Sequence, residues 1–444
     1  MSFFKLESNN LAVITHEHTY TYNQIPKVDF ISGQKELVLL LCKNTIDILA
    51  TYISAMNSEH AVMLLASDIN CELLANIVDT YQPKWIVGLN SYQGYEIYQN
   101  KLVRTKEVAT NIHPELAMLL STSGTTGSQK FVRLSYKNIR SNAESINEYL
   151  EIEENERAIM NLPLSYSYGM SIVNSHLLAG ASVLLTDASV MEKSFWEFVK
   201  EHKATSIAGV PFTYQMLQRI GFTKIELPHL KTMTQAGGRL NEKLVKHFAE
   251  YAKEQKKRFY VMYGQTEASP RMSYIPHEKT IEKSETIGIA IPGGELLIDK
   301  ETGELIYKGF NVMMGYAESL ADLAKEDELK GVLYTGDTAN IDESGYFTIT
   351  GRMKRFIKLF GLRINLDDVE KKLEQEYHIT LACTGNDDKL IVAVEQADFV
   401  EQIKEAIERL YKLHKTAYKV KVMDEIPRFA SGKIDYTKLK ESCL

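Results

Sequence analysis

The first part of the chain alternates short apolar runs with stretches of helical spacing. Apolar runs at residues 36–41, 61–66 and 84–88 predict buried β-strands, whereas apolar positions three or four apart at 46–56 and 71–81 predict helices. Strands that alternate with helices build β-α-β units with parallel strands. This part of the chain is therefore expected to fold as a layered α/β structure.

The same alternation continues to about residue 262 and then changes. Strands are predicted at 116–120, 131–134, 181–185, 206–210 and 259–262, and helices at 194–202 and 241–254. Between residues 288 and 350, short strands are separated by turn signals such as Asp299-Lys300-Glu301-Thr302-Gly303. That region is expected to form antiparallel β-structure.

The composition changes again after Gly351. A basic cluster at 352–355 precedes a predicted helix at 366–377, two strands around Asn386-Asp387-Asp388, a helix at 400–414, a strand at 418–423 and a loop to the end. We therefore predict an α/β fold in which residues 1–351 form a large N-terminal domain of several subdomains. Residues 352–444 are expected to form a small α+β domain.

Composition and charge argue against several classes of function. The chain has 444 residues and a formal net charge of −7, so it lacks the basic surface expected for binding nucleic acid or an anionic membrane. Its four cysteines form no C-x-x-C pair, which argues against a zinc site or a disulfide framework and fits a cytoplasmic location. The apolar stretches are far shorter than the ~20 residues of a membrane span.

A loop rich in hydroxyls and glycines follows the predicted strand at 116–120. Residues 121–130, Ser-Thr-Ser-Gly-Thr-Thr-Gly-Ser-Gln-Lys, supply backbone N–H groups, hydroxyl donors and the charge of Lys130, which together suit a polyphosphate. A polar hairpin loop is the alternative. A Walker-type P-loop does not fit, because Gln129 and Phe131 stand where that motif needs Gly and Ser or Thr, and because a strand is predicted to follow.

Other polar segments carry candidate chemistry, although each alone also suits an exposed turn. Tyr263-Gly264-Gln265-Thr266-Glu267 follows a predicted strand, where α/β sheets place ligands, and offers a ring for a base, a hydroxyl for a phosphate and a carboxylate for Mg²⁺. Asp337 follows a glycine turn and can accept both hydroxyls of a ribose. A basic segment starts at Gly351, and Lys433 follows Ser-Gly near the end of the chain.

In this order, the five segments resemble the AMP-forming adenylate ligase superfamily, which includes acyl-CoA synthetases, aryl-CoA ligases, peptide-synthetase adenylation domains and luciferase. The resemblance covers residues 116–433, and five ordered segments are far more specific than any one of them. It implies a loop for the ATP β- and γ-phosphates that contains Thr122, Ser123, Gly124, Thr125, Thr126, Gly127 and Lys130. It implies adenosine contacts from Gly237, Gly238, Arg239, Tyr263, Gly264, Gln265, Asp337 and Arg352.

The resemblance also implies catalytic and mechanical roles. Thr266 would bond the α-phosphate, Glu267 would ligate Mg²⁺, and Lys433 would be the lysine that promotes adenylation. Tyr166 would gate the passage between the carboxylate site and the thiol channel, with a core tyrosine as the alternative. Lys354 would be the hinge about which a mobile C-terminal domain rotates.

The chain departs from the family pattern in two places and lacks one of its variants. The phosphate loop usually ends Pro-Lys-Gly, but here it reads Gln129-Lys130-Phe131 and retains only the lysine. The region before that loop is shorter than in most relatives. Amino-acid-activating relatives usually carry an Asp near the Tyr166 position, and none lies between Pro163 and Ala179. An acyl or aryl acid is therefore expected rather than a free amino acid.

The implied reaction joins a small carboxylic acid to ATP, releases pyrophosphate and passes the acyl group to the thiol of coenzyme A or of a phosphopantetheine arm. ATP, Mg²⁺ and one of these thiols are the expected cofactors and co-substrates. Two alternatives stay open: an enzyme that stops at the adenylate or serves a dedicated carrier protein, and a non-catalytic nucleotide-binding homologue. The joint presence of Lys130, Glu267, Asp337, Arg352 and Lys433 argues against the second.

Overall fold

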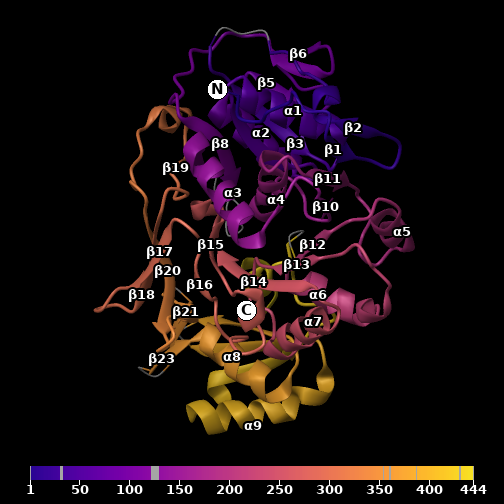
Figure 1. The fold of residues 1–444 in the computed structure, drawn as a ribbon. Helices are drawn as coiled ribbons and strands as arrows, with labels where there is room; N and C mark the ends of the chain where they lie inside the picture. The colour runs from indigo at the N-terminus through magenta and orange to yellow at the C-terminus, as the bar shows by residue number, and fades with distance from the viewer. Residues whose placement is uncertain are drawn as a thin grey trace.

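A computed structural model describes residues 2–30, 34–121, 130–353, 355–359, 362–386, 388–429 and 432–443. In Figure 1 the layers of the N-terminal part lie at the top, the β-structure of residues 294–352 lies to the left, and the C-terminal helices lie at the bottom. The α/β fold class expected from the sequence is confirmed. Among the described helices, none is long and apolar enough to cross a membrane.

A first sheet forms around the apolar runs near the N-terminus. Its parallel strands are β3 (Leu37–Cys42), β4 (Ala61–Ala66), β5 (Trp85–Val87) and β8 (Leu116–Ser121). Antiparallel strands extend its edges: β6 (Tyr95–Tyr98), β7 (Lys101–Arg104), β9 (Phe131–Ser135) and β19 (Gly315–Ala317). Ser121 pairs with Phe131, so the hydroxyl-rich loop joins two antiparallel strands and is followed by a strand, as expected.

A second sheet carries the later parallel strands. They are β1 (Leu11–Ile14), β10 (Arg157–Met160), β11 (Ser182–Leu185), β12 (Ser206–Gly209), β13 (Thr232–Gln235) and β14 (Arg258–Gly264). The antiparallel strands are β2 (Thr19–Thr21) at one edge, and β15 (Arg271–Tyr274) followed by the edge strand β16 (Ile289–Ala290) at the other. The pairing of β1 with β11 joins residues about 170 positions apart, and no local pattern indicated it.

Helices cover both sheets because their apolar faces need a partner. Between the sheets lie α1 (Ile46–Asn57), α3 (Tyr136–Leu150) and α4 (Ser167–Leu178), whose buried side chains share one apolar cluster with both sheets. The outer face of the first sheet packs on α2 (Cys71–Tyr81). The outer face of the second packs on α5 (Lys193–Glu201), α6 (Pro211–Arg219) and α7 (Glu242–Glu254).

The expected antiparallel region is present, and a distinct cluster follows it. Its strands are β17 (Gly294–Ile298), β18 (Glu304–Gly309), β20 (Val332–Ile341) and β21 (Phe347–Arg352). The chain after them forms β22 (Phe356–Leu359), β23 (Leu362–Asn365), α8 (Leu366–Tyr377), β24 (Leu381–Asn386), β25 (Lys389–Val394), α9 (Val400–Tyr411), β26 (Tyr418–Val422) and α10 (Tyr436–Cys443). Residues 357–418 have an apolar core of their own, centred on side chains such as Leu373 and Ile403.

Two details of the C-terminal part differ from expectation. The helix α9 ends at Tyr411 instead of residue 414, because Lys412 takes a left-handed conformation with φ of 53° that stops the helix. The loop expected at the end of the chain contains α10, which buries Leu439 and Cys443 against β24 and β25. Its apolar stripe is too short to stand out in the sequence.

Candidate active site

The parallel strands β12, β13 and β14 end at one edge of the second sheet, and the segments after them hold many of the residues singled out from the sequence. Val210 and Phe212 follow β12, Gly237 follows β13, and Thr266 follows β14. Such an edge is where α/β sheets bind ligands. The candidate site is therefore built from chain turns that converge on this edge.

Asp337 is the centre of a polar cluster that suits a ribose. Its carboxylate is only 4% exposed and accepts the hydroxyl of Tyr263 and the side-chain amide of Gln265, the latter at 3.1 Å. Arg352 lies opposite Asp337 on β21, with Nε 3.3 Å from Oδ1. Burial, and then the neighbouring carboxylate, raise the pKa of Tyr263 well above its ordinary value, so the phenol stays protonated and donates.

Glu267, Tyr316 and Lys130 form a second polar cluster. The Tyr316 hydroxyl donates to Glu267 Oε1 at 2.9 Å, and Lys130 Nζ lies 3.6 Å from the centre of the Tyr316 ring. Lys130 is also 3.8 Å from Glu318. Tyr316 reaches this position because β19 pairs with β9, the strand that begins just after Lys130. Thr266, which precedes Glu267, contacts Ser167, with 3.2 Å between the two hydroxyl oxygens.

Lys433 reaches the same region from the end of the chain. Figure 1 shows the yellow C-terminal chain extending from the bottom of the molecule to β12 and β13. Lys433 Nζ lies 5.5 Å from the centre of the Tyr166 ring. Burial, and then the positive charge of Arg352, lower the pKa of Lys433 to about 8, while Glu267 opposes the shift. The lysine is therefore near both polar clusters.

The hairpin that carries Lys433 is seated on residues after β12. Arg428 lies over the Phe212 ring at 5.4 Å. Gly432 has φ of 78°, and a Cβ at this position would stand 2.7 Å from Val210 and 3.3 Å from Phe212. A larger residue would clash there as well as strain the backbone. Glycine is therefore what allows this close seating.

Tyr166 and Gly237 approach each other closely in the site. Tyr166 precedes α4, and a Cβ on Gly237 would lie 2.3 Å from its hydroxyl oxygen. Gly238 backs on Pro211, with 3.2 Å from a built Cβ to the ring. Arg239 instead turns to α8, where it lies 3.8 Å from Glu374. Burial raises the pKa of Glu374 to about 8, and Arg239 only partly opposes it.

The remaining candidates lie outside the described residues. These are Lys354 and six residues of the hydroxyl-rich loop, namely Thr122, Ser123, Gly124, Thr125, Thr126 and Gly127. Gly264 and Gln265 are described: Gly264 packs against the backbone of Pro270, 1.8 Å from a built Cβ, and Gln265 also donates to the Thr335 carbonyl at 2.9 Å. Apart from Arg239, which turns to α8, the described candidates thus lie in one region.

Several site residues were not found from the sequence. Tyr316 contacts Glu267 but lies far from it in the chain, whereas Ser167, which contacts Thr266, directly follows the candidate Tyr166. Arg271 starts β15, and its sequence neighbours suggest an exposed side chain, yet it is buried.

The comparisons with known proteins agree with this geometry. The model of the AMP-binding enzyme family matches residues 31–317. The chain belongs to this family. Within the AMP-binding enzymes, it is 25% identical to the 2-succinylbenzoate–CoA ligase of Staphylococcus epidermidis over 98% of the chain and 96% of that ligase. It is 26% identical to the medium-chain fatty-acid–CoA ligase of Escherichia coli over 74% of the chain, but only 62% of that ligase.

Solved structures show the same AMP-binding enzyme fold. The o-succinylbenzoate CoA synthetase (MenE) of Bacillus subtilis, in complex with its acyl-adenylate intermediate, has a TM-score of 0.76 at 20% identity, covering 98% of this chain and 96% of that one. ATP-bound MatB of Rhodopseudomonas palustris has a TM-score of 0.76 at 19% identity, covering 100% and 99%. At this identity the likeness establishes the shared fold, including its C-terminal part.

Proposed function

We propose that this AMP-binding enzyme is an acid–thiol ligase that forms an acyl-adenylate from a carboxylic acid and ATP and then transfers the acyl group to a thiol. The observation that carries the proposal is the seating of the Lys433 hairpin on the body. It brings a cation beside Tyr166, under the influence of Glu267 and Arg352. Family membership supports the same reaction class.

In the first step, a carboxylate oxygen forms a bond to the α-phosphorus of ATP. The bond from that phosphorus to the oxygen leading to the β-phosphate breaks, and pyrophosphate leaves with the electron pair. Two anions repel each other, so positioning and positive charge account for most of the catalysis. Lys433 would supply charge at the reacting oxygens, Lys130 at the leaving pyrophosphate, and Thr266 a hydrogen bond to the α-phosphate.

The nucleoside would be held by the Asp337 cluster. A carboxylate can accept both ribose hydroxyls, and Arg352 and Gln265 hold this one in place. Tyr263 lies beside it, where its ring can face the base. Gly237 and Gly238 expose backbone close to the same region.

Magnesium would arrive with ATP. Among the described residues, no group of three or more His, Cys, Asp or Glu side chains could hold a metal by itself. Mg²⁺ usually binds one or two carboxylates together with substrate phosphates, and Glu267 suits that arrangement. Its Oε1 accepts from Tyr316, whereas no hydrogen bond to its other oxygen is found within the described part of the chain. Bound there, Mg²⁺ would neutralise phosphate charge.

The second step requires the Lys433 hairpin to leave, so that a thiol can reach the acyl-adenylate past Tyr166. We place the hinge at Lys354, between β21 and the separate apolar core of residues 357–418. The contacts across this boundary include polar ones such as Gln215 to Thr380 at 3.0 Å and Arg239 to Glu374 at 3.8 Å. Interfaces of this kind permit relative domain motion.

Coenzyme A is the leading acceptor, because the relatives are CoA ligases. A phosphopantetheine arm on a carrier protein, or release of the adenylate, is the second candidate. The acid is proposed to be an acyl or aryl acid, since these relatives act on 2-succinylbenzoate and on medium-chain fatty acids. A cytoplasmic location stays a prediction.

ATP–pyrophosphate exchange across a panel of carboxylic acids tests the first step. Acid-dependent exchange with AMP as the nucleotide product is expected. ADP as product, or nucleotide binding without exchange for any acid, would overturn the proposal. Adding coenzyme A or a phosphopantetheinylated carrier to an active pair then identifies the acceptor.

A further inference from the structure

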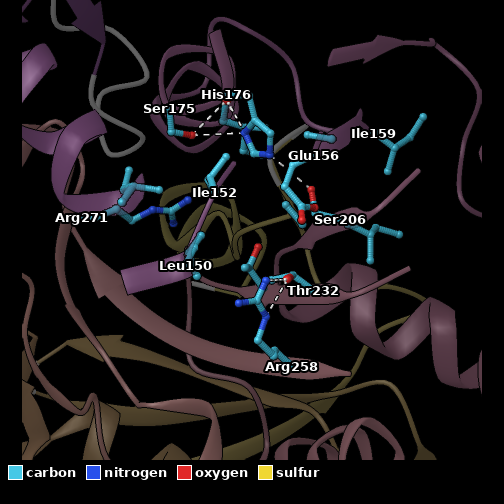
Figure 2. A pocket seen from close by; sticks show the side chains of 16 residues that line it. Leu150, Ile152, Glu156, Ile159, Ser175, His176, Ser206, Thr232, Arg258 and Arg271 are labelled. Carbon is cyan, nitrogen blue, oxygen red and sulfur yellow. Dashed lines mark hydrogen bonds between the residues drawn. The ribbon is translucent and has the colours of Figure 1, made fainter. Parts of the chain in front are cut away.

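A narrow cavity lies between the second sheet and the helices α3 and α4, and its lining includes the first residues of β12, β13 and β14. Half of the residues in its wall are aliphatic, whereas the polar half includes Glu156, His176, Arg258 and Arg271. Its volume is about 30 Å³, roughly the space of one or two water molecules. Figure 2 shows the guanidinium of Arg271 directed into this space. The Glu156 carboxylate of this wall pairs with Lys231 at 2.7 Å, so the burial of Arg271 needs an explanation of its own.

Arg271 is buried without a matching anion. Its side chain lies 3.8 Å over the Tyr168 ring, and Nη2 is 3.2 Å from the Ser171 hydroxyl. The residue is 3% exposed, and its Nε has no hydrogen-bond partner. Within the described part of the chain, no carboxylate lies within ion-pair distance of it. A buried cation of this kind is costly unless an anion pairs with it.

A second arginine on the same cavity provides the contrast. Arg258 pairs with the Glu151 carboxylate and donates to the Thr232 hydroxyl at 3.0 and 3.2 Å, so its charge and donors are used within the protein. Burial lowers the pKa of His176, also in the cavity wall, to about 4, which leaves that ring neutral. Arg271 is thus the charged side chain of this cavity wall for which the described residues provide no anionic partner.

The backbone of Arg271 is firmly held, as a binding residue requires. Asn142 exchanges hydrogen bonds with it, donating to the Arg271 carbonyl at 3.0 Å and accepting from its N–H at 3.3 Å. Asn311 donates to the same carbonyl at 2.8 Å. In the ladder between β14 and β15, Arg271 is paired with Gly264, two residues before Thr266. The guanidinium is therefore fixed relative to the adenylation residues.

The helix α4 sets the distance between the reacting carboxylate and Arg271. Ser167 contacts Thr266, and Ser171 contacts Arg271. These serines are four residues apart, so they share one face of the helix and lie roughly 6 Å apart along its axis. Arg271 is thus about one helical turn deeper than the site of adenylation, too far to hold the reacting carboxylate itself.

We infer that the acid activated at this site is a dicarboxylic acid, whose second carboxylate pairs with Arg271 while the first is adenylated. This inference rests on the proposed function. The fork of a guanidinium matches a carboxylate, and Nε is available for one of its oxygens. Because the cavity beyond Arg271 is small, the acid is short: a linear diacid of a few methylenes or a compact aryl diacid.

Matched pairs of acids test the inference. ATP–pyrophosphate exchange is measured with succinate, glutarate, adipate and isophthalate, and with butyrate, pentanoate, hexanoate and benzoate, which lack the second carboxylate. For the best diacid, kcat/KM is expected to exceed that of its matched monoacid roughly 10²–10⁴-fold, as in sites built around a polar group. The monoamide of that diacid, similar in size but uncharged, is expected to behave like the monoacid.

Variants separate a specificity role from a structural one. Arg271→Met is expected to abolish the preference and leave the diacid no better than the monoacid, whereas Arg271→Lys keeps part of it. Arg258→Met is the control from the same cavity and is expected to keep the preference. The ratio of the two acids does not depend on how much protein folds, and calorimetric ATP binding shows that the variants retain the nucleotide site.

The outcomes of this experiment are distinct. Equal use of monoacids and diacids by the unaltered enzyme, or a preference that survives Arg271→Met, overturns the dicarboxylate inference and leaves the ligase proposal standing. A preference lost equally in Arg258→Met also overturns it. No acid-dependent exchange with any acid, in an enzyme that binds ATP, overturns the proposed function itself.

Discussion

The Asp337 cluster, proposed to hold the ribose, and the Lys433 hairpin lie in the same region but depend on different parts of the chain. Asp337 meets Tyr263, Gln265 and Arg352 through the strands β14, β20 and β21, which are held by sheet pairing. Lys433 arrives on a hairpin near the chain end that is seated on Val210 and Phe212. With the proposed roles, the difference predicts that the nucleoside site is formed at all times, whereas the charge for adenylation is present only when the hairpin is docked.

The largest effect is expected from Lys433→Ala. Loss of a well-placed charge at the reacting oxygens lowers adenylation roughly 10²–10³-fold, measured as ATP–pyrophosphate exchange. Thiolysis of a supplied acyl-adenylate should be spared, because the hairpin leaves before that step. Lys440→Ala, an exposed lysine of α10, is the control. Exchange near the rate of the unaltered enzyme would contradict the assignment.

Asp337→Ala tests the proposed ribose site. It removes the acceptor shared by Tyr263, Gln265 and Arg352, and with it the hydrogen bonds expected for the ribose. Hydrogen bonds to charged groups contribute about 1.5–3 kcal/mol, so KM for ATP should rise about 10- to 100-fold. The KM for ATP of Asp337→Asn should lie between that of the unaltered enzyme and that of Asp337→Ala. An unchanged KM would show that the ribose binds elsewhere.

The pH dependence of adenylation should report Lys433. Because its pKa is lowered to about 8, the lysine is charged below that pH and neutral above it. We expect kcat/KM for ATP to be about tenfold lower at pH 9 than at pH 7, since this parameter follows the free enzyme. Lys433→Arg, which does not titrate here, should remove the inflection even if its activity is low. An inflection that persists would point to another group.

Lys354→Pro should give the smallest change in rate, and it tests whether the hinge lies at this residue. Proline fixes φ and limits the rotation that carries the hairpin away. Thioester formation should slow several-fold more than adenylation, with Lys354→Ala as control. Both half-reactions are followed separately by stopped assays with and without the thiol. Equal loss in the two would argue against a hinge here.

Much of the fold was readable because its elements are local. The helix α2 and the strand β4 match the expected ranges, since apolar spacing and flanking turns define both. The missing pieces are long-range: β1 pairs with β11, and Tyr316 reaches Glu267 through the pairing of β19 with β9. No window of sequence contains such pairs.

The site shows the same division. The resemblance identified Asp337 and Lys433 because they lie in recognisable segments, and the structure brings both to one cleft. Arg271 escaped notice because its surroundings are made by α4 and β14, which are distant or unremarkable in the sequence. A charged residue in a short strand is expected to be solvated until its neighbours are known.

Lys130 precedes a strand whose sheet is otherwise assembled mainly from the first hundred or so residues. The strand β9 pairs with β8, β8 with β4, and β4 with β3, and none of these strands carries a candidate catalytic side chain. A truncated enzyme that begins at residue 110 would keep every candidate site residue but would lose the strands β3 and β4. Without the strands that support β8 and β9, Lys130 would lose its position. The N-terminal layers are therefore expected to be required for turnover, although they carry no candidate site residue.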